Sequence, residues 1–301
     1  MTDTPIPPGI LLLDKPLGLS SNAALQRVRR VFGRPKAGHT GSLDPLATGM
    51  LPICLGEATK LAGELLEGDK AYEFTVRLGE QRSTGDAEGQ VVREAPIPAG
   101  WRERAAAVAT SFEGDRLQVP PIYSALKHQG QPLYRLARQG IEIDRPARAI
   151  TVRSLESLAD GDDADACFRV VCSKGTYVRV LGEELAAAFG TCGYLAALRR
   201  SWAAPFEQRR LISLEQLEAA PDPQSYVINA DAALPHLPAL EVDADIHRRL
   251  LQGQRVRGDW LAPAGRIRVY GPGDVFCGVG ELSDGVLQPR RLFNGLGPSA
   301  A

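Results

Sequence analysis

Residues 38–52, GHTGSLDPLATGMLP, combine turn-forming residues with polar groups that can take part in chemistry. The three glycines allow backbone conformations that other residues resist, and Pro45 and Pro52 restrict the residue before each of them. Asp44 therefore lies in a stiff backbone, either as a reactive carboxylate or as the cap of the turn ahead of Pro45. A single aspartate can act as a nucleophile or general base. An arginine partner would orient such a carboxylate and lower its pKa.

The chain lacks the sequence motifs of several common reaction classes. It contains no G-x-x-x-x-G-K-[ST], G-x-G-x-x-G, H-E-x-x-H or G-x-S-x-G segment. The five cysteines are scattered, with no C-x-x-C pair and no Cys/His cluster at zinc spacing. These absences weigh against P-loop, nicotinamide-dependent, zinc and serine-hydrolase chemistry, and we expect no metal.

Charge is segregated along a chain whose net charge is only −1. Residues 15–43 carry six basic side chains and no acidic one, and residues 121–153 carry six basic side chains against two acidic ones. Acidic residues gather elsewhere, as in 160–165. Such segregation indicates a surface that faces a polyanion, although solvated helix faces would give the same pattern.

The apolar pattern mixes helices and strands irregularly over the first 220 residues, which favours an α+β fold on a mixed, largely antiparallel sheet. Residues 71–78 alternate cleanly between apolar and polar side chains, as in a half-buried strand. We expect further strands at 9–14, 90–93 (antiparallel to 71–78), from 149 and at 166–172. We expect helices from Ser20 or Ser21 to Gly33, from a Thr59 cap to Gly68, at 101–112, up to Gly190, and after a capping box of Ser213 and Gln216. Residues 38–52 are expected as loop and turn, and 120–148 as an inserted loop.

The chain divides into two parts at a proline-containing stretch, 221–238. Short strands separated by glycine-rich turns follow it, beyond a helix capped by Asp243, and predict a small β-barrel-like domain. We therefore expect one domain at 1–228 and another at 239–301. No segment has the pattern of a signal peptide or a membrane span, so we expect a cytoplasmic protein.

Residues 38–52 closely resemble the signature of the TruB family of tRNA pseudouridine synthases. The resemblance continues in the same order through most of residues 9–210, in the segments 9–16, 55–60, 69–72, 121–127, 172–179 and 198–200. Ser42 stands where alanine is frequent in the family. The C-terminal part resembles a PUA domain, an RNA-binding module, on its glycine-punctuated strands and on 286–292, VLQPRRL.

This resemblance implies the pseudouridine synthase fold and the isomerisation of uridine to pseudouridine in the T-arm of tRNA, at position 55 of the usual tRNA count. The reaction breaks the N-glycosidic bond, turns the uracil and forms a C–C bond, so it requires no redox or group-carrying cofactor. The target base would be flipped into the pocket, and the 120–148 loop would close on the T-stem and loop.

The resemblance also implies residue roles. Asp44 matches the catalytic aspartate, which would add to the base or the ribose, or act through a glycal. Arg179 matches the arginine that pairs with it, and Tyr72 matches the tyrosine that stacks on uracil, although its strand position would suit a core residue equally well. The remaining matches are Tyr177 and Leu198 as pocket residues, His39 as the residue that fills the space of the extruded base, and Lys15 as a structural or RNA-facing residue.

Basic residues of the insertion, including Lys127, Arg145 and Arg148, would then contact phosphates. Two other interpretations remain open: an RNA-binding or RNA-folding module in which Asp44 is only structural, and a guide-dependent enzyme within a ribonucleoprotein. The inserted loop and the lack of a basic low-complexity tail favour a stand-alone enzyme, which we expect to act as a monomer on tRNA without guide RNA.

Overall fold

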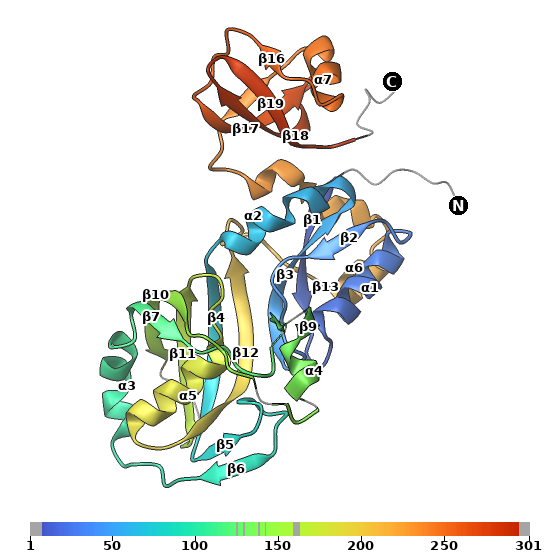
Figure 1. Cartoon of the computed structure of the whole chain (residues 1–301). Coiled ribbons are helices and arrows are strands. Elements are labelled where there is room, and N and C mark those ends of the chain that lie inside the picture. The colour runs from blue at the N-terminus through green and yellow to red at the C-terminus, as the bar shows by residue number, and fades with distance from the viewer. Residues whose placement is uncertain are drawn as a thin grey trace.

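A mixed ten-stranded sheet forms the larger part of the molecule (Figure 1) in the computed structural model, which describes residues 8–124, 126–128, 130–137, 139–141, 143–158 and 163–294. Its strand order is β13-β1-β3-β12-β4-β11-β10-β7, with β14 paired to β1 and β2 to β3. All of its pairs are antiparallel except β1–β13 and β3–β12. The strands are β1 (Gly9–Lys15), β2 (Ala37–His39), β3 (Ala47–Leu55), β4 (Lys70–Leu78), β7 (Gly114–Gln118), β10 (Arg148–Leu158), β11 (Asp165–Cys172), β12 (Gly193–Ala203), β13 (Ile212–Ser213) and β14 (Val227–Asn229). The predicted fold class, α+β on a mixed and largely antiparallel sheet, is confirmed.

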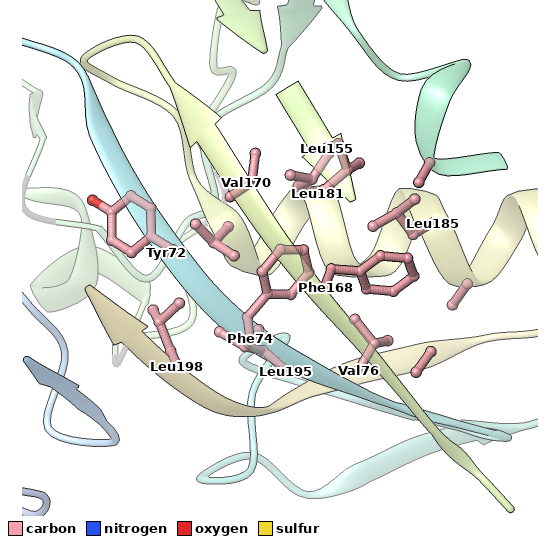
Figure 2. Packing of buried hydrophobic residues seen from close by; sticks show 14 of the residues in the cluster. Tyr72, Phe74, Val76, Leu155, Phe168, Val170, Leu181, Leu185, Leu195 and Leu198 are labelled. Carbon is pink, nitrogen blue, oxygen red and sulfur yellow. The ribbon is translucent and has the colours of Figure 1, made fainter. Parts of the chain in front are cut away.

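Two groups of helices cover different parts of this sheet (Figure 1). Helices α3 (Trp101–Thr110) and α5 (Val178–Phe189) pack over the half that contains β4, β10 and β11, and they bury the cluster around Phe74 and Phe168. The two phenylalanine rings stack with centroids 5.4 Å apart (Figure 2). Helices α1 (Ser21–Val31) and α6 (Leu214–Ala219) pack over β1 and β3 in a second cluster. The predicted caps are present, since Ser20 accepts from the amide of Ala23 and the capping box at Ser213 is complete.

The segment 38–52 is not loop and turn throughout, so this prediction was wrong. It contains the end of β2 and most of β3, and only residues 40–46 form the turn between them. Strand β3 lies between β1 and β12, and all but one of its residues are buried. A strand buried on both faces has a continuous apolar sequence without alternation. Here Gly49 and Pro52 interrupt that apolar sequence and favour a turn instead.

Two other local predictions, the Thr59 cap and the partner of the strand at 90–93, were also wrong. Thr59 lies inside a 3₁₀ helix, η1 (Gly56–Leu61), where its hydroxyl donates to the Gly56 carbonyl, and α2 (Ala62–Glu67) follows. Strand β6 (Val91–Glu94) pairs with β5 (Glu80–Arg82) rather than with β4, because β11 and β12 already occupy both edges of β4. The insertion 120–148 contains the short elements β8 (Lys127–His128), β9 (Gln131–Pro132) and α4 (Leu133–Ala137).

A separate five-stranded sheet forms near the C-terminus, in the order β15-β17-β18-β19-β16. Its strands are β15 (Ala239–Glu241), β16 (Val256–Arg257), β17 (Gly265–Gly271), β18 (Val275–Ser283) and β19 (Val286–Leu292); 3₁₀ helices η2 (Pro223–Tyr226) and η3 (Ala230–Ala233) precede it. Helix α7 (Ala244–Leu251) begins at the predicted cap, where Asp243 accepts from the Ile246 amide at 2.8 Å. Arg266 of this sheet forms a two-pronged ion pair with Glu64 of α2. Within the described residues, no helix is both long and apolar enough to span a membrane.

Candidate active site

Side chains of other elements hold the turn at residues 40–46 through hydrogen bonds to its backbone. The Ser21 hydroxyl, at the start of α1, accepts from the Leu43 amide at 2.7 Å and donates to its carbonyl at 3.0 Å. Lys15 of β1 reaches the Pro45 carbonyl at 3.5 Å, and the Ala47 amide closes the turn on the Asp44 carbonyl at 3.0 Å. The backbone that carries Asp44 is therefore fixed, as the residue types predict.

Arg179 joins this turn to a second acidic residue. Its Nη2 lies 3.0 Å from Asp44 Oδ2, and its Nη1 lies 3.7 Å from Asp86 Oδ2. The guanidinium also donates to the carbonyls of Thr84 at 3.1 Å and Tyr123 at 2.7 Å. The Arg179 and Asp86 side chains are 7% and 4% exposed, whereas the Asp44 side chain keeps 43% of its surface open. The arginine is thus locked in place, and Asp44 alone of the three is accessible to a ligand.

The Asp44 side chain lines a pocket of about 560 Å³. Tyr72, Tyr177, Arg179 and Leu198, each predicted as a site residue, line the same pocket. Tyr72 and Leu198 lie on neighbouring strands β4 and β12 at one end of the apolar cluster (Figure 2). The pocket therefore presents one carboxylate and one guanidinium among aromatic and apolar side chains and three hydroxyl-bearing residues (Ser42, Ser124 and Thr176), which suits a flat, largely uncharged ring.

The pKa of Asp44 does not shift in the expected direction. Burial among protein atoms raises the pKa of its carboxyl, and Asp86 adds to this rise, whereas Arg179 and Lys15 only partly oppose it. We expected the arginine to lower this pKa. The difference arises because the surrounding protein and the second carboxylate, neither of which is apparent from the sequence, outweigh the ion pair.

Not every predicted residue lies in the pocket. His39 is half-buried at the end of β2 and does not line it, and its buried Nδ1 has no hydrogen-bond partner among the described residues. Arg145 is half-buried and donates to the Pro120 carbonyl at 3.1 Å, across the base of the insertion, whereas Arg148 is exposed. The side chain of Lys127 lies outside the described residues.

Lys15 cannot face RNA in this structure, because its side chain is fully buried. Its ammonium donates to the carbonyls of Pro16 at 2.9 Å and Leu19 at 2.7 Å, and reaches that of Pro45. Of the two roles that the resemblance left open, this burial favours the structural one.

The buried ammonium of Lys15 should make the free energy of unfolding depend on pH. Burial lowers its pKa from 10.5 to about 8, so between pH 8 and 10.5 the unfolded chain binds more protons than the folded one. Stability should therefore gain up to about 3 kcal/mol from this group as the pH rises through that window. Urea unfolding of wild type and Lys15→Met at pH 7.5 and 10 checks this, since the variant should lack the gain; equal pH dependence in both proteins would contradict it.

Sequence reasoning missed Asp86 and Arg200, two buried charged residues near the turn. Asp86 follows Thr84-Gly85, and its carboxylate accepts from the Thr84 hydroxyl at 2.5 Å and the Glu88 amide at 3.1 Å. The sequence alone makes Asp86 look like an ordinary turn residue. Within the described part of the chain, no group of three or more His, Cys, Asp or Glu side chains could hold a metal ion.

Comparison with known proteins gives the class of this enzyme. Residues 29–178 match the model of the TruB family pseudouridylate synthase N-terminal domain, and residues 238–293 match that of the pseudouridine synthase II TruB C-terminal domain. The fold is similar to that of a solved Cbf5-Nop10-Gar1 complex (TM-score 0.68, 25% identity, 91% of this chain and 78% of that one). It is also similar to that of an archaeal box H/ACA sRNP Nop10-Cbf5 complex (TM-score 0.69, 22% identity, 96% and 86%). The protein is a pseudouridine synthase.

Curated relatives narrow this class to one family. A protein of Nitrosococcus oceani named tRNA pseudouridine synthase B is 46% identical over 95% of this chain and 94% of its own. One of Ralstonia nicotianae with the same name is 48% identical over 95% and 94%. The chain belongs to the TruB family of pseudouridine synthases.

Proposed function

We propose that this enzyme isomerises uridine to pseudouridine in the T-arm of tRNA, at position 55, without a cofactor. The observation that carries the proposal is Asp44 at the pocket of about 560 Å³, held at 3.0 Å by Arg179 and flanked by Tyr72. The names of the curated relatives support tRNA as the substrate. Action on tRNA in turn places the enzyme in the cytoplasm.

In this proposal Asp44 is the catalytic residue. Its accessible carboxylate attacks the nucleotide, at the base or at the ribose, or assists through a glycal, while Arg179 orients it through the ion pair. Tyr72 stacks on the uracil and is placed to move a proton, and Tyr177 and Leu198 form the walls of the uridine site. The raised pKa of Asp44 means that the folded protein disfavours the ionised form that the reaction uses.

The uracil reaches Asp44 only if it leaves the RNA stack, so the target base flips into the pocket. Flipping costs a few kcal/mol, which contacts to the extruded base and within the vacated stack help to recover. We assign His39 to the vacated space. Burial and the charge of Arg200 lower the pKa of its imidazole, so a neutral aromatic ring is available for stacking.

The rest of the chain supplies RNA contacts. We place the catalytic domain at 1–228, with 120–148 as its RNA-contacting insertion, and a PUA-like RNA-binding domain at 239–301. The separate five-stranded sheet and the C-terminal family match at 238–293 support this division. We propose that the enzyme acts as a monomer on the T-stem and loop, without guide RNA.

Arg148 provides a test of the insertion. Its side chain is exposed at the start of β10 and is expected to contact a phosphate, whereas Arg145 is expected to hold the base of the insertion. Arg148→Gln should weaken tRNA binding and reduce the slope of log Kd against log salt by about one. Arg27→Gln is the matched control, because Glu218 already neutralises Arg27 in a 2.5 Å ion pair. An unchanged slope in Arg148→Gln would remove Arg148 from the interface.

Release of hydrogen from uracil C5 tests the function itself. Because the new C–C bond forms at C5, isomerisation releases the hydrogen at that carbon to solvent. A tRNA transcript carrying tritium at uridine C5 should release one equivalent per molecule, and a transcript with cytidine at position 55 should release none. Equal release from both transcripts would contradict the proposed site.

A further inference from the structure

Arg200 is a buried arginine beside the pocket, on strand β12. Its side chain is 1% exposed, and its Nε donates to the Met50 carbonyl at 2.7 Å and its Nη2 to the Gly41 carbonyl at 2.8 Å. These two carbonyls lie on either side of Asp44 in the chain, one at the start of the turn and the other on β3. One planar guanidinium therefore ties both flanks of the turn together.

The turn is shaped to admit this side chain. Gly41 has φ +73°, and a Cβ added there would lie 3.1 Å from Arg200 Nη1. Gly49 has φ +97°, and a Cβ there would lie only 2.2 Å from the Arg200 carbonyl oxygen. Gly41 thus permits close approach of the turn to the Arg200 side chain, and Gly49 permits close approach of β3 to the Arg200 backbone. Both glycines also adopt an unusual backbone angle.

Arg200 is also the cross-strand neighbour of the pocket tyrosine. It lies directly opposite Tyr72 in the pairing of β12 with β4. Burial raises the pKa of Tyr72, and the nearby charge of Arg200 only partly opposes this rise. Arg200 thereby connects the turn that carries Asp44 to the position on β4 that carries Tyr72, a second residue of the pocket.

The burial of this charge calls for an explanation. Within the described residues Arg200 forms no salt bridge with a carboxylate, and its guanidinium donates to the carbonyls of Met50 and Gly41. A buried cation without a counter-ion is costly, and an apolar side chain of similar volume is often at least as stabilising. The fixed arrangement of the turn and of Tyr72 can offset the free-energy cost of burying this charge.

We propose that Arg200 is a positioning residue of the reaction, which holds Asp44 and Tyr72 in a fixed relative arrangement by binding the carbonyls of Gly41 and Met50 from its place opposite Tyr72 in the β12–β4 pairing. The inference rests on the proposed function of the pocket. Arg200 does not face the substrate, so its loss should slow the chemical step and leave tRNA binding intact.

Single-turnover kinetics with excess enzyme test this role. Arg200→Gln should lower the rate constant of pseudouridine formation by about 100-fold, because small misplacements of reacting groups cost that much. Arg200→Lys, which keeps the charge but lacks the planar fork, should recover part of the loss. The Kd for tRNA should stay within about threefold of wild type for both, as expected when only the transition state is affected.

A neighbouring arginine provides the matched control. Arg199 points to the other face of β12 and pairs with Asp14 at the surface, so Arg199→Gln should keep the wild-type rate constant. In a Tyr72→Phe background the loss caused by Arg200→Lys should shrink, since the two residues lie opposite each other and we expect part of the loss to act through the phenol.

The outcomes separate the two proposals. If wild type forms no pseudouridine, the proposed function and the role of Arg200 both fail. If wild type is active and Arg200→Lys keeps its rate constant, only the role of Arg200 is overturned. If Arg200→Gln yields no folded protein, the rate constant of Arg200→Lys alone tests the role of Arg200. A rise in the Kd for tRNA with an unchanged rate constant would instead show an RNA-binding role and overturn the inference.

Discussion

Asp44→Asn is expected to abolish pseudouridine formation, with a loss of at least about 10⁴-fold in the single-turnover rate constant, the scale seen when a reacting side chain is removed. Asparagine has nearly the same shape but cannot attack as a carboxylate does. Binding of tRNA should stay close to wild type. The variant should be as stable as wild type or more so, because the raised pKa of Asp44 shows that its charged form is disfavoured in the folded state at neutral pH.

Asp14→Asn is the control for this substitution. Asp14 also pairs with an arginine, Arg199, but at the surface and away from the pocket. It should keep the wild-type rate constant. Retained turnover in Asp44→Asn would show that another group is the nucleophile, and loss of tRNA binding would show that Asp44 serves recognition.

Arg179→Met is expected to have the largest effect on stability, about 3–5 kcal/mol, because it leaves a buried charge without its partner. Arg179 binds both Asp44 and Asp86, and the Asp86 side chain is only 4% exposed. The rate constant should also fall strongly, because Asp44 loses the contact that orients it. Urea unfolding and single-turnover kinetics measure the two effects separately.

A second substitution identifies the cause of the lost stability. Adding Asp86→Asn to Arg179→Met should recover part of it by removing the unpaired charge. Arg199→Met breaks a half-exposed ion pair instead and should cost no more than about 1 kcal/mol. Equal losses in Arg179→Met and Arg199→Met would contradict the central role given to the buried pair.

Local patterns in the sequence predict those parts of the fold in which one face is buried and the other solvated. The alternation from Tyr72 to Leu78 identified β4, and the serine caps identified α1 and α6. Strand β3 was not predicted, because both of its faces are buried and its sequence does not alternate. Strand β6 was found but assigned the wrong partner, since pairing depends on which edges of β4 are already occupied.

The site divides in the same way. The types and spacing of residues around Asp44 predict a rigid turn, whereas the pairing of Asp44 with Arg179 came from the family resemblance, because no local pattern relates two residues so far apart. Asp86 and Arg200 were missed for a related reason. Each is an unremarkable charged residue in the sequence and gains its role only when the sheet brings it beside the turn.

Nucleotide-resolution mapping of pseudouridine in an unmodified tRNA transcript, incubated with the wild-type protein, tests the central claim most directly. The account predicts pseudouridine at position 55 in the T-arm and at no other uridine. Absence of product despite normal tRNA binding would contradict the enzymatic function, and product at another position would contradict the proposed substrate site.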